Sequence, residues 1–222
     1  MNTASEYEFE PVRGLPERLP AGETMLWQGE PRAAALARRA FHVPTLAVYF
    51  GVLVAWRALA AVADHEPLGR AVFGTLWIAA LAAAAIGVLA ALAWLTARTT
   101  VYTITTERIV IRFGIALPMT VNIPFRLIES AAVKAHADGT GDIPLVLARG
   151  ERTSYLVMWP HVRPWRIARP EPMLRAIPDV AHAAGVLALA LAAAAGTTPV
   201  RAISAVPDEQ EAASAPLATA AH

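Results

Sequence analysis

Two apolar stretches near the middle of the chain decide its class: Phe41–Ala63, FHVPTLAVYFGVLVAWRALAAVA, and Ala71–Leu95, AVFGTLWIAALAAAAIGVLAALAWL. The first stretch carries one charged side chain, Arg57, and the second carries none. An α-helix of about 20 apolar residues crosses the roughly 30 Å of hydrocarbon in a bilayer. Because only residues 64–70 separate the two stretches, they predict a transmembrane α-hairpin and therefore a membrane protein.

The composition of the whole chain excludes several kinds of function. Of the 222 residues 56% are hydrophobic, the formal net charge is +1 and cysteine is absent. A net charge so close to zero argues against nucleic acid as a partner. The absence of cysteine excludes disulfides, thiol catalysis and Cys-ligated metals. The first forty residues lack the apolar run of a signal peptide, so we expect the N-terminus to be retained.

The arginines predict how the hairpin is oriented. Arg38 and Arg39 precede the first apolar stretch and Arg98 follows the second, whereas the connector at 64–70 offers Asp64, His65, Glu66 and Arg70. Arginine and lysine concentrate on the side of a membrane that is not translocated. We therefore expect residues 1–40 to be a cytoplasmic N-terminal segment and 41–95 to be the hairpin, with both flanks in the cytoplasm. Arg57 either makes an intramembrane contact or extends its guanidinium to the outer headgroups.

After the hairpin the hydrophobic pattern changes to a period of two, which is typical of β-strands. The predicted strands are Val101–Thr105, Arg108–Phe113, Met119–Ile123, Leu127–Val133, Ile143–Ala148 and Tyr155–Trp159. Turns rich in small residues are expected at 138–142 and 149–151, and a helical segment is expected from about Pro172. Several short strands at close spacing predict an antiparallel β-barrel or sandwich.

Two segments near the C-terminus complete the predicted organisation. Val180–Ala195 is apolar apart from His182 and is short for a membrane span, so it is either the C-terminal helix that caps the barrel or a third span. The capping helix is the preferred interpretation, which makes 98–195 the β domain. Residues 196–222 are rich in Ala, Thr, Pro and Ser and are expected to form a disordered tail.

The segment Trp159–Pro172 predicts a binding surface. Its four prolines favour extended or polyproline backbone, and at three residues per turn Arg163, Arg166 and Arg169 would line one edge. Trp159 and Trp165 would lie beside this edge. Exposed arginine and tryptophan suit a protein partner or anionic lipid headgroups. Alternatively, the tryptophans fill the core and the arginines only face water.

The stretch YTITTERIVIRFG at 102–114 resembles the opening hairpin of bacterial pleckstrin-homology (PH) domains, which often follow a pair of membrane helices. More specific blocks resemble the PuhB family of photosynthetic-complex assembly proteins of purple bacteria. These blocks are FEPVRGLP at 9–16, LWQG at 26–29, RPW at 163–165 and RPEPMLR at 169–175.

This resemblance, over roughly residues 6–195, implies a PH-like domain in an α+β membrane protein of the bacterial inner (intracytoplasmic) membrane. It also implies a non-enzymatic assembly factor for the reaction centre and its core light-harvesting (LH1) complex, with subunits of these complexes, membrane lipids and a second copy of the chain as partners. The alternative is a generic membrane-tethered PH-domain protein that binds lipid or organises another envelope complex.

The sequence predicts neither catalysis nor a bound cofactor or metal. The six histidines are scattered without an HExxH spacing, and no phosphate-binding glycine loop is present. His42, at the predicted membrane boundary, could ligate the magnesium of a bacteriochlorophyll through a neutral ring nitrogen. The simpler interpretation is an interfacial histidine that is hydrogen-bonded to headgroups or backbone.

Overall fold

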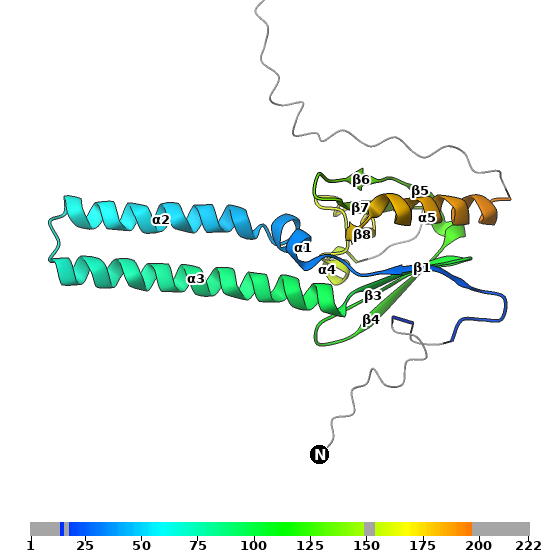
Figure 1. Ribbon diagram of the computed structural model, residues 1–222, viewed down its shortest axis with the longest axis horizontal. Helices are drawn as coiled ribbons and strands as arrows, with labels where there is room; N and C mark the ends of the chain where they lie inside the picture. The colour runs from blue at the N-terminus through cyan, green and yellow to red at the C-terminus, as the bar shows by residue number, and fades with distance from the viewer. Residues whose placement is uncertain (1–13, 16–17, 149–153, 197–222) are drawn as a thin grey trace, which may run out of the picture.

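The computed structural model describes residues 14–15, 18–148 and 154–196. A long helical hairpin projects from a β domain that carries a C-terminal helix (Figure 1). The predicted α+β class, with an apolar hairpin followed by antiparallel sheets and a helix, is therefore confirmed. The expected turn at 149–151 and the expected tail from residue 197 onward lie outside the described residues.

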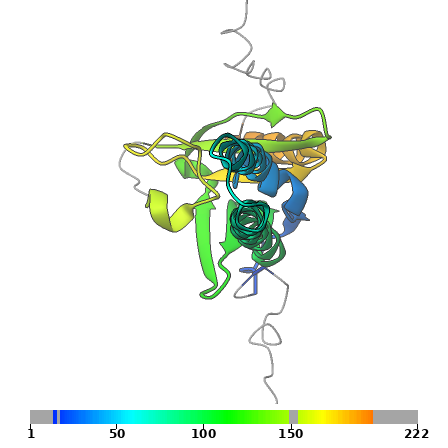
Figure 2. The same ribbon diagram turned by 90° about the vertical axis from the view of Figure 1, so that its left-hand side faces the viewer.

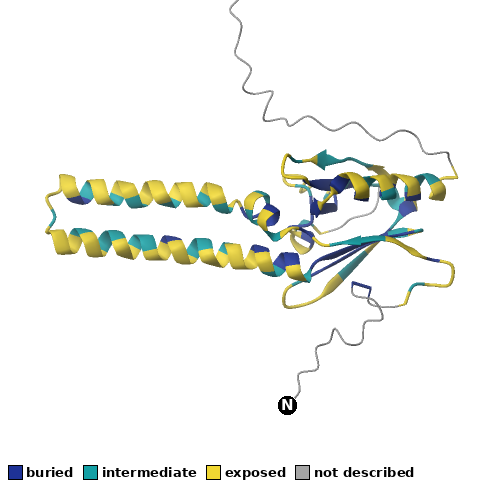
Figure 3. Cartoon of the chain, in the orientation of Figure 1, coloured by how far each residue is buried: buried dark blue, intermediate teal, exposed yellow. Residues whose placement is uncertain are grey.

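Helices α2 (Val43–Ala63) and α3 (Leu68–Thr99) form the apolar hairpin. Both are long and apolar enough to cross a membrane, and Figure 3 shows that their residues are mostly exposed or intermediate in burial. With 32 residues against 21, α3 is eleven residues longer, or about 16 Å at 1.5 Å per residue. Its final turns pack on α1 (Ala33–Arg39) through a cluster that includes Leu36, Ala93 and Ala97. These turns and α1 form a helical neck between the hairpin and the β domain.

Arg57 points toward the tip of the hairpin. Its Nη2 atom lies 2.9 Å from a carboxylate oxygen of Glu66 in the connector. A Cβ atom at Gly74 would lie 2.7 Å from the same nitrogen, so the glycine leaves room for the guanidinium on α3. The side chain thus extends toward the connector, as the snorkelling interpretation expected, and it meets a carboxylate there.

The first sheet has the strand order β1-β2-β3-β4, and all neighbouring strands are antiparallel. Strands β2 (Val101–Thr105), β3 (Arg108–Phe113) and β4 (Met119–Pro124) confirm the predicted alternating segments. Strand β1 (Met25–Gly29) was not predicted. It precedes the hairpin and pairs with β2, which follows it. The neck and hairpin are therefore inserted between two neighbouring strands, and the sheet includes a strand from the segment before residue 40.

The second sheet is built around β7 (Thr140–Leu147), which pairs with β5 (Ile128–Ala131), β6 (Lys134–Ala135) and β8 (Met173–Pro178). A short 3-10 turn, η2 (Phe125–Leu127), connects the two sheets.

Two sequence predictions in this region are wrong. Tyr155–Met158 forms the helical turn α4 instead of a strand, and the segment after Pro172 begins with strand β8 instead of a helix. Both runs are short and apolar, and periodicity does not separate strand from helix over so few residues.

Helix α5 (Val180–Ala194) covers the core of the β domain. One face buries Val180, Ala183, Leu187 and Ala190, and this observation supports the capping helix over a third span. The helix packs against buried side chains from both sheets: Tyr102, Ile104, Ile109, Ile111, Phe113, Ile143, Leu145, Leu174 and Ile177.

We expect Leu187→Ala to lower the free energy of unfolding by about 2–5 kcal/mol, because it opens a cavity under α5. Leu189→Ala removes the same atoms from the same helix at a side chain that is 60% exposed, against 2% for Leu187. This control should change stability by less than about 0.5 kcal/mol. Denaturant unfolding in detergent micelles, followed by tryptophan fluorescence, measures both. Equal losses would contradict the capping role.

Candidate functional site

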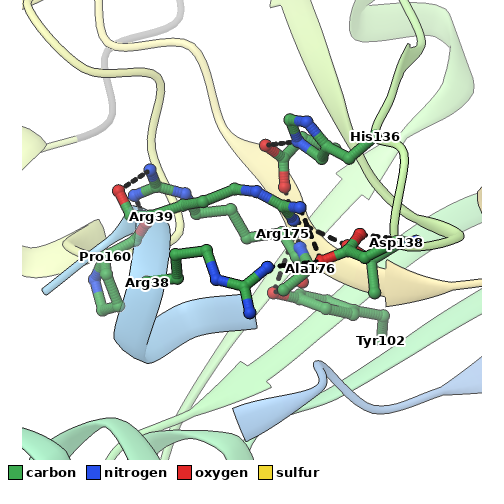
Figure 4. A network of polar contacts seen from close by, with 10 residues as sticks. Arg38, Arg39, Tyr102, His136, Asp138, Pro160, Arg175 and Ala176 are labelled. Carbon is green, nitrogen blue, oxygen red and sulfur yellow. Dashed lines mark hydrogen bonds and ion pairs between the residues drawn. The ribbon is translucent and has the colours of Figure 1, made fainter. Parts of the chain in front are cut away.

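A buried polar network joins the hairpin to the β domain (Figure 4). At its centre the guanidinium of Arg175, on β8, donates from Nη1 to the carbonyl of Pro160 at 3.1 Å and from Nη2 to the carbonyl of Arg39 at 3.3 Å. Burial lowers the pKa of Arg175, and the nearby carboxylate of Asp142 opposes this shift. The single side chain therefore fixes the end of α1 and the loop after α4 to the second sheet.

The carboxylate of Asp142, on β7, stabilises an unusual backbone conformation at Ala176 in β8. Its Oδ1 atom accepts from the backbone N–H of Ala176 at 2.8 Å, and its Oδ2 atom lies 3.1 Å from Nε2 of His136. Ala176 has φ 54°, a left-handed conformation that is uncommon for residues other than glycine. Its carbonyl accepts from the N–H of Arg32 at 2.8 Å, so both polar groups of Ala176 are bonded and the segment before α1 is attached to β8.

Tyr102, His161 and Thr100 form a chain of buried hydrogen bonds that reaches α3. The hydroxyl of Thr100 donates to the carbonyl of Thr96 at 2.7 Å and therefore accepts from Nε2 of His161 at 3.1 Å. Nδ1 of His161 is then left to accept from the hydroxyl of Tyr102 at 2.8 Å, which itself accepts from the N–H of Arg175 at 3.0 Å. These roles assign a neutral imidazole that carries its proton on Nε2.

The surroundings keep this chain uncharged. Burial, with a smaller contribution from the Arg175 cation, lowers the pKa of His161 to about 3. Burial also raises the pKa of the Tyr102 phenol. Among the described residues, every buried side-chain nitrogen or oxygen has a hydrogen-bond partner. The chain is thus a satisfied connection, in which the Tyr102 hydroxyl also lies 3.4 Å from the carbonyl of Arg175.

Arginines of α1 extend this polar network to the turn before β7. We call the whole network, from Arg39 to Arg175, the joint. Arg39 lies 2.7 Å from Oδ2 of Asp138 and donates to Thr140 Oγ1 at 2.6 Å, and Arg38 reaches the same carboxylate oxygen at 3.5 Å. Arg39 and Thr140 hold the pKa of Asp138 well below its usual range. Helix α1, which leads into the hairpin, is therefore bound to the second sheet by charge as well as by backbone contacts.

Two clefts lie beside the joint. The first, of about 200 Å³, is lined by Arg39, Ala40, His42, Tyr155, Trp159, Val162, Pro164, Trp165 and Arg175. The second, of about 370 Å³, is lined by Glu30, Pro31, Ala33, Trp94, Ala97 and Arg98, with the guanidinium of Arg98 lying 4.7 Å from the centre of the Trp94 ring. His42 thus lines a cleft together with tryptophan and arginine side chains, at the start of α2.

The segment that was expected to be polyproline is a closed loop, so that expectation is wrong. Val162 pairs with Pro172, and Trp165 has φ 64°, which interrupts an extended backbone. We call residues 163–171 the Trp165 loop.

Two of the three predicted binding arginines meet at one carboxylate. Arg163 lies 3.0 Å and Arg166 3.7 Å from the carboxylate of Glu171, and Arg169 is exposed. The ring of Trp159 packs edge-on against Phe41 at 5.2 Å, whereas Trp165 is 91% exposed. Their role in binding stays a prediction.

Sequence reasoning did not identify Tyr102, His161 and Arg175 as a cluster. The sequence carries one local signal of this cluster. Arg175 is the one charged residue of MLRAIP at 173–178, and a charged side chain inside a buried strand requires polar partners. The identity of those partners depends on contacts between residues far apart in the sequence. Within the described residues, no group of three or more His, Asp or Glu side chains is arranged to hold a metal ion.

The structure defines a class of protein in which an apolar helical hairpin is attached to a small domain of two β-sheets. Sequence comparison identifies the family. The bacterial PH domain family matches residues 39–194, a range that includes the hairpin, and the chain belongs to this family. A Rhodobacter capsulatus protein, named an uncharacterized 23.7 kDa protein in the puhA 5′ region, is 39% identical over 185 residues. The alignment covers 82% of this chain and 86% of that protein. No solved structure matches the chain.

The buried imidazole predicts a specific dependence of stability on pH. The unfolded chain protonates His161 below its ordinary pKa of 6.5, whereas the folded protein does so only near 3. Between these values the unfolded state binds more protons, so stability falls as pH is lowered, by up to about 1.4 kcal/mol per pH unit. From pH 7 to pH 5 this amounts to about 2 kcal/mol.

His161→Gln removes the titrating ring, so the stability difference between wild type and variant should shrink by about 2 kcal/mol from pH 7 to pH 5. Denaturant unfolding in detergent micelles at both pH values measures this difference. His182→Gln, on the exposed face of α5, controls for the loss of an imidazole elsewhere. A constant difference for His161→Gln would refute the assignment of a buried neutral histidine.

Proposed function

We propose that this protein is a membrane-bound assembly factor for the photosynthetic reaction centre and its core light-harvesting complex, and that it acts by binding and not by catalysis. The observation that carries the proposal is the extent of the similarity to the Rhodobacter capsulatus protein, because the alignment covers most of both chains. That protein is named for its place in the puhA 5′ region. The blocks at 9–16, 26–29 and 163–175, which resemble the PuhB family, support the same assignment.

In this proposal the hairpin crosses the bacterial inner membrane and the β domain lies in the cytoplasm. Arg38, Arg39 and Arg98 all lie where the hairpin meets the domain, whereas at the other end Asp64 and Glu66 accompany Arg70, so the excess of arginine is at the domain end. This distribution of charge is the one expected for a non-translocated domain. The rigid joint then holds the cleft at His42 and the Trp165 loop close to the membrane surface, where reaction-centre and LH1 subunits emerge.

The exposed surfaces of the hairpin and the loop suit contacts with other membrane proteins. Large side chains such as Trp56, Phe73 and Trp77 are exposed along α2 and α3 and are available to neighbouring helices of a subunit or of a second copy. Beside the cleft, Arg166 and Arg169 add positive charge, while Arg163 is held by Glu171 and shapes the loop. Such a surface fits acidic segments of a partner at the membrane boundary.

Deletion of the gene should lower the amounts of assembled reaction centre and core antenna while pigment synthesis continues. Absorption spectra of membranes and native gels of solubilised complexes measure this outcome, and the intact gene on a plasmid should restore it. Accumulation of a pigment precursor would instead favour a biosynthetic enzyme. Normal complexes in the deletion strain would favour a PH-domain protein that serves another envelope system.

The double variant Arg166→Gln/Arg169→Gln should reduce co-purification of complex subunits at least threefold while leaving the level of the protein in membranes unchanged. Both side chains are exposed, so the stability cost is small. Arg163 is retained because its loss would leave the buried carboxylate of Glu171 without its closest cation. Arg126→Gln, an exposed arginine at the opposite end of the first sheet, is the matched control. Unchanged co-purification would exclude the loop as a partner surface.

A further inference from the structure

Strand register places one exposed apolar loop at the hairpin end of the β domain. Strand β2 begins two residues after α3 ends, and its first residue, Val101, pairs with Arg112 near the end of β3. The loop at 114–118 between β3 and β4 therefore returns toward the hairpin. Its side chains Ile115 and Leu117 are 44% and 77% exposed. An apolar loop tip of this kind costs free energy in water.

A second exposed apolar segment lies at the same end. The ring of Trp159, which follows α4, packs against Phe41 just before α2, and Trp165 lines a cleft with His42. Leu156 on α4 and Ile167 in the Trp165 loop are exposed, like Trp165 itself. Figure 2, which looks at the domain from the hairpin side, shows α4 and the β3–β4 loop beside the two helices. Both segments thus lie at the end of the β domain from which the hairpin projects.

We propose that Ile115, Leu117, Leu156, Trp165 and Ile167 form an apolar rim that inserts into the interfacial layer of the bilayer crossed by the hairpin. This inference rests on the proposed membrane crossing and does not require a role in assembly, and it places the Trp165 loop, with Arg166 and Arg169, at the level of the headgroups. The rim adds a third membrane contact to the two spans, and it holds the β domain against the bilayer.

The position and chemistry of the rim argue for lipid as its occupant. The rim belongs to segments next to the hairpin, so the bilayer around the spans is the medium it meets first. Tryptophan favours the headgroup level, and apolar side chains on a polar element bury into the headgroup and acyl boundary. Arg166 and Arg169 in the same loop and Arg98 at the end of α3 supply charges that attract anionic headgroups. The acidic side chain of the loop, Glu171, is largely buried between Arg163 and Arg166, at 3.0 and 3.7 Å, so the loop keeps a net positive charge.

The absence of cysteine allows a direct test in the full-length protein. Single cysteines at Ile115 and at Ala168, which is exposed beside Ile167, would carry an environment-sensitive fluorophore. A third cysteine at Met25 is the control, because Met25 is also 44% exposed but pairs with Thr105 at the far end of the sheet. Each variant is reconstituted without other proteins into phosphatidylcholine nanodiscs, with or without phosphatidylglycerol. Lipids that carry a nitroxide just below the headgroup serve as quenchers.

We expect at least twofold stronger quenching at 115 and 168 than at 25, and stronger quenching still with phosphatidylglycerol. Adding Leu117→Asp and Trp165→Asp should reduce quenching at both sites to the level of the control. Circular dichroism and the fluorescence of the Met25 label check that the variants are folded. Quenching at 115 and 168 equal to that at 25 would overturn the proposal and leave the rim as a surface for protein.

Discussion

The pairing of β1 with β2 is the constraint on which the rest of the structure depends. The two strands are neighbours in one antiparallel sheet, yet the neck and the whole apolar hairpin lie between them in the sequence. Both ends of the hairpin must therefore return to the same edge of the β domain. An antiparallel pair of long helices satisfies this requirement, and the extra turns of α3 together with α1 span the distance to the sheet.

The buried joint fixes the orientation of the β domain relative to the hairpin. Arg175 bonds to carbonyls of two separate segments, while Tyr102 and His161 link it to the last turn of α3. Removing one partner from such a cluster leaves a buried charge or donor unsatisfied, which costs more than the lost bond alone. Because the network connects to α3 and to α1, which leads into α2, the β domain does not swing freely about the neck. Surfaces such as the Trp165 loop are thereby kept in one position relative to the hairpin.

The length and periodicity of apolar runs predicted those helices and strands for which these two signals are sufficient. The apolar run Phe41–Ala63 became α2, and the alternation in Arg108–Phe113 became β3, because length and period suffice in each case. Strand β1 was missed because its partner lies beyond the hairpin, and the fourteen-residue region around the Trp165 loop was misread because prolines close a loop as readily as they extend a chain. The candidate site was hardest to predict, since Tyr102 and Arg175 meet only when the two sheets pack.

The insertion of the hairpin between β1 and β2 also orders events during biosynthesis. Strand β1 leaves the ribosome before either long helix, and its partner emerges only after both. In the proposed membrane topology, the first sheet therefore remains open at β1 until both apolar helices have entered the bilayer. After two crossings β1 and β2 lie on the same side of the bilayer and can pair. A chain that crossed only once would separate the two strands. In that topology the pairing of β1 with β2 requires both crossings, so the order of the strands couples closure of the sheet to insertion of the hairpin.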